Sequence, residues 1–308
     1  MITPRTTRLV RVADLATYRA ALVSLACDGA PLDARDRLVI VPTRAAGALL
    51  RRGLERARLT DAHALVLPEF VVPRELPLAL AQRADVSASE APSDVREVLM
   101  GVAARAASDA GHEPPFQVRP GLLAEMVSFY DDLRDRTQTV DTFERLAVGR
   151  LTPGAEYDRG AGRLLRQTHF LVAAFRAFEQ LCGDHRLLDA HGLRALAMST
   201  SAARPWRHVV VAVGDQARDP YGLCVADWDL LARVPGLASL DVVTTDRMLA
   251  GAWHERVHQL LPGIEEVRIG DSPGPAPRLR VRRESEEERR EPSTSLRRAW
   301  DVRDREEE

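Results

Sequence analysis

The 308-residue sequence contains no lysine, so all 43 of its basic residues are arginines. This absence excludes several kinds of chemistry. A phosphate-binding loop of the Walker type needs a lysine ammonium group on the nucleotide phosphates, and Schiff-base catalysis needs a lysine amine. A nuclease site whose motif ends in lysine is excluded for the same reason. A GC-rich genome is the simplest cause of an all-arginine composition, but the exclusions hold whatever the cause.

Cysteine is scarce, and long apolar segments are absent. The three cysteines, Cys27, Cys182 and Cys224, are odd in number and far apart, so we expect reduced thiols rather than disulfides or a zinc site. The apolar runs are far shorter than the roughly 20 residues of a membrane span. The N-terminal residues lack the apolar segment of a secretory signal. These features predict a cytoplasmic protein with no membrane partner.

Composition and charge describe a globular chain. Hydrophobic residues make up 45% of the sequence and charged residues 29%, which is enough apolar material for a buried core. The length of 308 residues predicts about two domains. The net charge is only −2, so binding to a polyanion would have to depend on a local basic patch.

The first part of the chain, residues 1–73, alternates short strands with helices. The continuous apolar run RLVIV is typical of a strand buried on both faces. Strands are predicted at 7–12, 37–41 and 64–67, and helices at 15–25 and 44–58. This alternation predicts a parallel sheet of the doubly wound type.

Residues 74–204 show helical periodicity, and strand signals return in residues 205–275. Helices are predicted at 95–107, 120–135, 139–146, 161–182 and 190–198, with loops at 113–115 and 152–154. Strands are predicted at 208–213 and 240–245, followed by a helix at 252–261. We therefore expect an α/β fold whose sheet, built from residues 1–73 and 205–275, is interrupted by a helical insertion subdomain.

The C-terminal segment has a different composition. Residues 276–299 mix arginine and glutamate with few apolar residues, which predicts a charged flexible loop. Residues 300–308 read as a strand that leads into an acidic helix start. We expect them to be the truncated beginning of a following domain.

The turn after the first strand is where a nucleotide-binding fold would hold phosphate. Residues 12–15 read Val-Ala-Asp-Leu, without glycine or lysine. Asp14 would repel a phosphate and is better explained as the N-cap of the following helix. The turn therefore predicts a degenerate ATP site and no nucleotide cofactor in this chain.

The turn after the second strand has the opposite character. Thr43 and Arg44 follow the buried strand at the start of a helix, where free backbone N–H groups and the helix dipole favour an anion. Small residues at 45–47 would let a phosphodiester backbone approach, and Arg51 and Arg52 lie two turns further along. These residues predict a phosphate-contacting surface. An ordinary capped surface helix is the alternative.

Two further patterns contain acidic or metal-binding residue types. Asp215 follows the strand HVVVAV at a position that holds magnesium in ATPases, but a structural turn is favoured without a phosphate-loop lysine. His254, Glu255 and His258 form an HExxH sequence, in which two histidines on one helix face can bind zinc with the glutamate as base. Arg256 inside the motif and the absence of an extended HxxGxxH favour a structural helix without metal.

Taken in order, these parts resemble the N-terminal helicase-like region of AddB-type subunits of bacterial helicase–nucleases and related PD-(D/E)XK nuclease-family proteins. The segment TRAAGALLRR at 43–52 is similar to helicase motif Ia, which contacts single-stranded DNA, and Asp215 falls at the position of motif II. Residues 303–308 resemble the start of a second RecA-like domain. The resemblance implies a RecA-like fold with an inactivated superfamily 1 helicase site.

The function implied by the resemblance is non-catalytic DNA binding within an enzyme that processes DNA ends in double-strand-break repair and recombination. The partners would be single-stranded DNA and a motor helicase–nuclease subunit, and the exonuclease site would lie beyond residue 308. Thr43, Arg44, Arg51 and Arg52 are the expected DNA-binding residues, with no catalytic residue, metal or cofactor in this chain. The alternatives are a zinc metallopeptidase at residues 254–258 and an α/β binding module without a nucleic-acid role.

Overall fold

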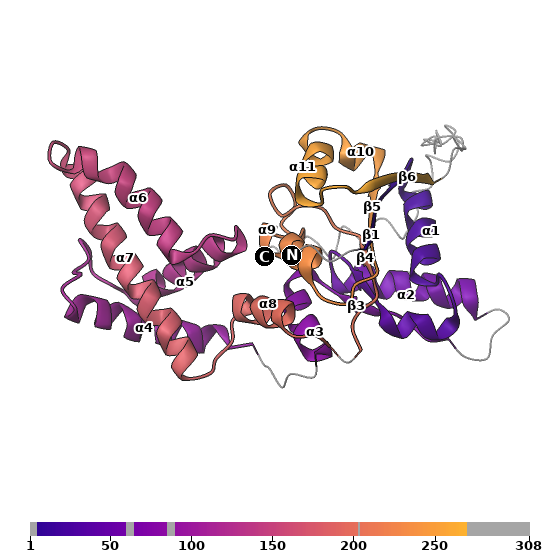
Figure 1. Cartoon of the computed structure of the whole chain (residues 1–308), viewed down its shortest axis with the longest axis horizontal. Helices are drawn as coiled ribbons and strands as arrows, with labels where there is room; N and C mark the ends of the chain where they lie inside the picture. The colour runs from indigo at the N-terminus through magenta and orange to yellow at the C-terminus, as the bar shows by residue number, and fades with distance from the viewer. Residues whose placement is uncertain (1–4, 60–64, 85–89, 203, 270–308) are drawn as a thin grey trace, which may run out of the picture. The chain divides into compact units, whose positions relative to one another are not determined.

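The computed structural model describes residues 5–59, 65–84, 90–202 and 204–269 (Figure 1). The predicted charged loop and the predicted start of a further domain, together residues 276–308, lie outside this described part. The elements that form the sheet and the helices around it all belong to one compact unit.

A sheet of six parallel strands is the centre of the fold. The strands are β1 (Thr6–Val12), β2 (Arg37–Ile40), β3 (Glu69–Val71), β4 (His208–Val211), β5 (Ser239–Thr245) and β6 (Glu265–Ile269), in the spatial order β3-β2-β4-β5-β1-β6. Each neighbouring pair is parallel. The predicted α/β fold with a parallel sheet is therefore confirmed.

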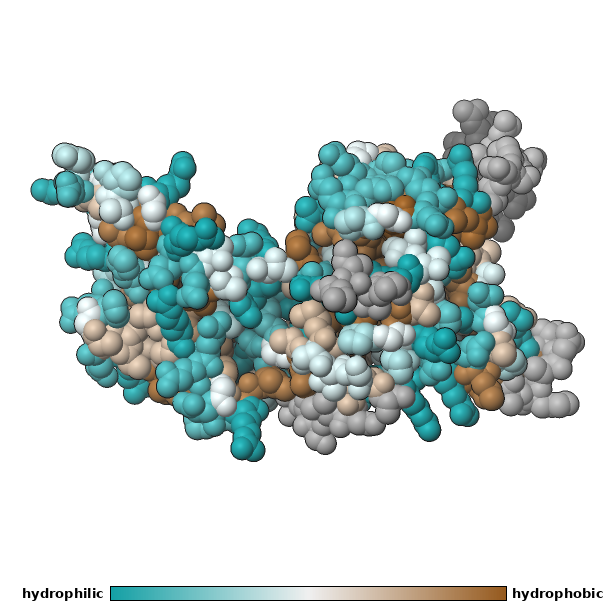
Figure 2. All heavy atoms as spheres, viewed as in Figure 1, coloured by the Kyte–Doolittle hydropathy of each residue, from teal (hydrophilic) through white to brown (hydrophobic). Residues whose placement is uncertain are grey.

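Alternate side chains of the strands enter two separate cores, one on each face of the sheet. On one face Val10, Val39 and Val210 pack with α1 (Leu15–Ala26) and α2 (Arg44–Arg58). The strand residues on the opposite face pack with α3 (Leu76–Arg83), α8 (Ala190–Ser199), α9 (Val225–Arg233), α10 (Asp246–Leu249) and α11 (Ala252–Leu260). Most of the outer face seen in Figure 2 is hydrophilic, with hydrophobic residues in separate smaller patches.

Helices dominate the chain between β3 and β4. The four longest are α4 (Ser93–Asp109), α5 (Pro120–Asp135), α6 (Val140–Ala155) and α7 (Arg159–Asp184). The described part of the chain also has two short 3-10 helices: η1 (Pro31–Asp36) precedes β2, and η2 (Pro73–Glu75) precedes α3. Phe170, Phe175 and Phe178 of α7 are fully buried in a core shared with α4 and α5. Tyr130 of α5 packs edge-on against Phe175 and Phe178. This core is distinct from the two cores of the sheet.

Three elements differ from the sequence-based expectations. The third strand, expected at 64–67, is β3 at Glu69–Val71, and the apolar residues before it pack against the α1 and α2 core in irregular backbone. The expected loop at 152–154 lies in the last turn of α6, where Pro153 removes one helical hydrogen bond. β6 was not predicted, because this exposed edge strand consists mainly of charged residues and lacks apolar alternation.

Candidate functional site

A crevice opens at the carboxyl edge of the sheet between β2 and β4. The chain after β2 enters α2 on one face, whereas the chain after β4 leads to α9 on the opposite face. Adjacent connections that diverge in this way leave a crevice at the strand ends, where α/β proteins bind ligands. Here it is a pocket of about 390 Å³ whose lining includes Thr43, Arg44, Arg74, Gln216 and Tyr221.

Thr43 and Arg44 form the α2 side of this crevice. The hydroxyl of Thr43 accepts a hydrogen bond from the Ala46 backbone N–H at 3.1 Å, so Thr43 caps the helix. The side chain of Arg44 is 82% exposed and is paired with the carboxylate of Glu75, with Nε 3.0 Å from Oε1. An exposed ion pair of this kind is weak in water, so a phosphate can compete with Glu75 for Arg44.

Glu75 limits the positive charge of the crevice. Its Oε2 accepts a hydrogen bond from the Val72 backbone N–H at 3.2 Å, which fixes the carboxylate beside Arg44. Burial raises the pKa of Glu75, but the hydrogen bonds from Arg44 and Val72 outweigh burial and leave the pKa below its ordinary value. The carboxylate is therefore ionised at neutral pH and faces any anion that approaches Arg44.

The structure does not bring all four predicted DNA-binding residues into one pocket. Arg51 lies over the ring of Phe70, with its guanidinium carbon 5.9 Å from the ring centroid. Arg52 lines a separate, mostly apolar pocket of about 470 Å³ between α1 and α2. Thr43 and Arg44 therefore share a site, whereas Arg51 and Arg52 lie on other parts of α2.

Several crevice residues were not predicted from the sequence. Arg74 follows β3, and Tyr221, which is 57% exposed, lies with Gln216 in the loop after β4. This loop has no space for a side chain at Gly222, because a Cβ there would lie 2.6 Å from backbone atoms of Asp215 and Gln216. Their position directly after a parallel strand is the signal that could have identified these residues. Arg74 was missed because the third strand was expected several residues too early.

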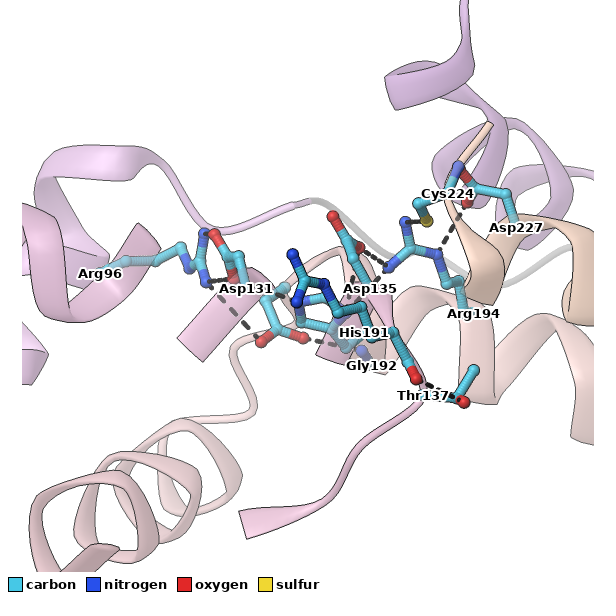
Figure 3. A network of polar contacts seen from close by, with 11 residues as sticks. Arg96, Asp131, Asp135, Thr137, His191, Gly192, Arg194, Cys224 and Asp227 are labelled. Atoms are coloured by element: carbon cyan, nitrogen blue, oxygen red, sulfur yellow. Dashed lines mark hydrogen bonds and ion pairs between the residues drawn. The ribbon is translucent and has the colours of Figure 1, made fainter. Parts of the chain in front are cut away.

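A buried polar network around Arg194 of α8 forms part of the crevice lining (Figure 3). Arg194 Nε donates to Asp227 at 2.9 Å, and Nη1 donates to Asp135 at 2.9 Å. Nη1 also lies 2.8 Å from His191 Nδ1, and Nη2 lies 3.4 Å from Cys224 Sγ. Burial raises the pKa of the Cys224 thiol, so it is not a reactive thiolate. Arg194 thus connects α5, α8 and α9 beside the crevice.

The network continues through His191 to a second arginine (Figure 3). His191 Nε2 lies 3.1 Å from Asp131 Oδ1, and Arg96 of α4 donates to Asp131 Oδ2 at 2.9 Å. Asp131, Asp189 and His191 place metal-ligand atoms near one another. Arg96 also lies 3.9 Å from Asp189, so the charge of one guanidinium is shared between the two carboxylates. The arrangement is therefore that of a structural ion-pair network.

Asp215 is buried in the turn after β4, with only 3% of its surface exposed. Its carboxylate accepts a hydrogen bond from the Ala217 backbone N–H at 3.2 Å and forms an ion pair with Arg256 of α11. The guanidinium supplies the positive charge that a bound magnesium ion would otherwise supply. Asp215 therefore connects the turn after β4 to α11.

The two histidines of the HExxH sequence contact a carboxylate from another element. His254 Nε2 and His258 Nε2 lie 2.5 Å and 3.0 Å from Oε1 of Glu266 in β6. Glu255 has a different partner and accepts a hydrogen bond from Gln259 Nε2 at 3.3 Å. The motif's own glutamate is thus not a member of the His254–His258–Glu266 cluster.

The first βα turn contains a capping carboxylate. Asp14 accepts a hydrogen bond from the Thr17 backbone N–H at 2.8 Å, which confirms Asp14 as the N-cap of α1. Hydrogen bonds from Thr17 hold the pKa of Asp14 below its ordinary value. A negative charge therefore occupies the turn in which a nucleotide-binding fold holds phosphate.

Three further observations concern the cysteines, membrane spans and relatives of the chain. All three cysteines are free thiols, as the sequence predicts. No helix in the described ranges combines the length and the apolar character that crossing a membrane requires. No protein-family model matches the chain, and a comparison with curated proteins gives no match.

Proposed function

We propose that this chain is the non-catalytic, helicase-like DNA-binding region of an AddB-type bacterial helicase–exonuclease that acts in the repair of double-strand breaks. In this proposal the parallel sheet is RecA-like, and the helices between β3 and β4 are an insertion. Two facts support it: the order of the parts resembles that family, and the segment similar to motif Ia begins at a crevice.

The observation that carries the proposal is the position of Arg44. Its guanidinium is exposed at the N-terminus of α2, where backbone N–H groups also favour an anion. Arg74 adds a further cation to the lining of the crevice, and the exposed ring of Tyr221 provides a surface for base stacking. A single strand crossing the carboxyl edge would meet charge and an aromatic ring without any base-specific contact.

The same proposal assigns no ATP-driven movement to this chain. Asp14 occupies the first βα turn, and Asp215 is paired with Arg256. The movement would come from a partner motor subunit. Arg51 and Arg52 would contact DNA only where the strand runs on along α2, which makes Arg44 the strongest contact and Arg52 the weakest.

A salt titration tests this function. Binding of unstructured single-stranded oligonucleotides is measured by fluorescence anisotropy for wild type, Arg44→Ala and Arg105→Ala. Arg105 is exposed on α4 and provides the matched loss of charge. We expect Arg44→Ala to reduce the salt slope by about 0.7 and to weaken binding equally on unrelated sequences. Arg105→Ala should leave both unchanged.

The outcomes also separate the alternatives. Identical slopes and affinities for all three proteins would mean that α2 is an ordinary surface helix. No salt-dependent binding by wild type would instead favour an α/β binding module without a nucleic-acid role. The metallopeptidase alternative receives no support from the geometry, because Glu255 bonds to Gln259 rather than facing the two histidines.

A further inference from the structure

His254, His258 and Glu266 converge at the surface beside the edge strand β6. The two histidines are one helical turn apart on α11, so their side chains share a face. Their rings are nearly perpendicular, with centroids 5.1 Å apart. Each side chain offers one ligand atom, and these three atoms lie within 4.8 Å of one another.

Glu266 is held in place by a residue of the neighbouring strand. Its Oε2 accepts a hydrogen bond from Arg11 Nη1 at 2.7 Å, which leaves Oε1 directed toward the histidines. Arg11 Nη2 also donates to Asp246 at 3.0 Å, so its charge is shared between two carboxylates. Partners of this kind orient the ligands of metal sites.

The cluster is open to solvent and close to the spacing that a metal ion needs. The side chains of His254, His258 and Glu266 are 45%, 38% and 31% exposed. Ligand atoms in a tetrahedral zinc site lie roughly 3.3 Å apart. The two N–O separations of 2.5 Å and 3.0 Å must therefore widen by less than about 1 Å. Small rotations of partly exposed side chains can supply this change.

We propose that His254, His258 and Glu266 bind a divalent transition-metal ion of the zinc class, which ties α11 to β6. Two imidazole nitrogens and one carboxylate oxygen suit Zn²⁺, whereas Mg²⁺ and Ca²⁺ prefer oxygen ligands. Water would take the fourth position. The site departs from the expectation that this chain binds no metal, and its ligand set contains Glu266 in place of Glu255.

The role of this site is structural. A hydrolytic zinc site would need a base beside the bound water, and Glu255 is bonded to Gln259 instead. β6 pairs with β1 alone in the described sheet, and all of its residues are exposed. An ion shared between α11 and β6 would restrain this edge strand. It would also hold α11, which contributes Arg256 to the ion pair with Asp215.

The test uses the full chain, stripped of metal with a chelator and titrated with Zn²⁺ alone by isothermal titration calorimetry. We expect one ion per chain and a rise in Tm on adding zinc. Glu266→Gln, and His254→Gln combined with His258→Gln, should each weaken zinc binding at least about tenfold and abolish the rise in Tm. Glu255→Gln is the matched control and should leave both unchanged.

Two binding results would overturn the proposal: equal zinc binding by wild type and the ligand variants, or binding lost in Glu255→Gln and kept in Glu266→Gln. Circular dichroism checks that each variant folds, and the single histidine variants replace the double variant if it does not. Replacing Zn²⁺ with Co²⁺ tests whether a cysteine is a ligand of the bound ion. A cobalt spectrum without a thiolate charge-transfer band supports the site, and a spectrum with that band contradicts it.

Discussion

Arg256, in the middle of α11, forms an ion pair with the buried carboxylate of Asp215, which lies 41 residues earlier in the turn after β4. The two residues belong to unrelated sequence patterns, an HExxH helix and a Gly-Asp turn. The structure connects the two patterns, because the guanidinium of Arg256 compensates the charge of Asp215, which is only 3% exposed. The contact also fixes the loop that forms one wall of the crevice.

Removing Arg256 should destabilise the protein. In Arg256→Gln the buried Asp215 keeps a backbone N–H partner but loses its counter-charge, which we expect to lower the free energy of unfolding by about 1–3 kcal/mol. Asp215→Asn in the same chain should recover much of this loss, because the buried charge is then gone. Urea unfolding of both single variants and the double variant measures the coupling. A free energy within about 0.5 kcal/mol of wild type for Arg256→Gln would contradict the prediction.

Glu75→Gln should strengthen binding to single-stranded DNA. The substitution frees Arg44 from its ion pair and removes a negative charge from the crevice. We expect affinity to rise roughly threefold or more at low salt, where charges are least screened. Anisotropy titrations measure the effect, with Glu125→Gln on the exposed surface of α5 as the control for charge. Weaker binding by Glu75→Gln would argue against a phosphate at Arg44.

The chain should not bind Mg-ATP. It contains no lysine, and the ionised Asp14 caps α1 in the first βα turn, so the triphosphate meets a like charge instead of a cation. Isothermal titration calorimetry with Mg-ATP should show no heat of binding. Micromolar affinity would refute this expectation. Asp14→Ser keeps a capping side chain but removes the negative charge. Mg-ATP binding by this variant alone would show that the charge of Asp14 excludes the nucleotide.

Acid should weaken the contact between α4, α5 and α8. Burial raises the pKa of Asp131, but hydrogen bonds from His191 and Arg96 outweigh it and set the pKa below the ordinary value. The carboxylate therefore stabilises the fold above its unfolded-state pKa, and this contribution is lost as pH falls through the lowered folded-state pKa. Asp131→Asn should be clearly less stable than wild type at pH 7. The difference should shrink toward pH 3, as urea unfolding at each pH would show.

The sequence predicts elements well where local patterns determine them. The predicted bounds of the helix at 44–58 agree with α2, because Thr43 is a capping residue and apolar residues recur at helical spacing. β2 was predicted because a short apolar run is typical of a strand buried on both faces. In both cases the signal lies within a few residues of the element.

The contacts that shape the candidate sites were not predicted from the sequence. Glu266 lies only 8 residues after His258, but it was missed because β6 lacks an apolar pattern. Glu75 faces Arg44 because β2 and β3 are neighbours with parallel carboxyl ends. The Arg44–Glu75 pairing depends on strand order, which periodicity in a single sequence does not specify.

The place of β1 between β5 and β6 has a consequence for synthesis of the protein. Arg8 in β1 bonds with Asp241, 233 residues later, so β1 must wait for β5 and β6 to be made. A ribosome adds roughly 5–20 residues each second, so the wait is on the order of ten seconds or more. During that time Leu9, Val10 and Val12 lack the strands that bury them. The nascent chain should therefore be a substrate for chaperones that hold apolar segments until β5 emerges.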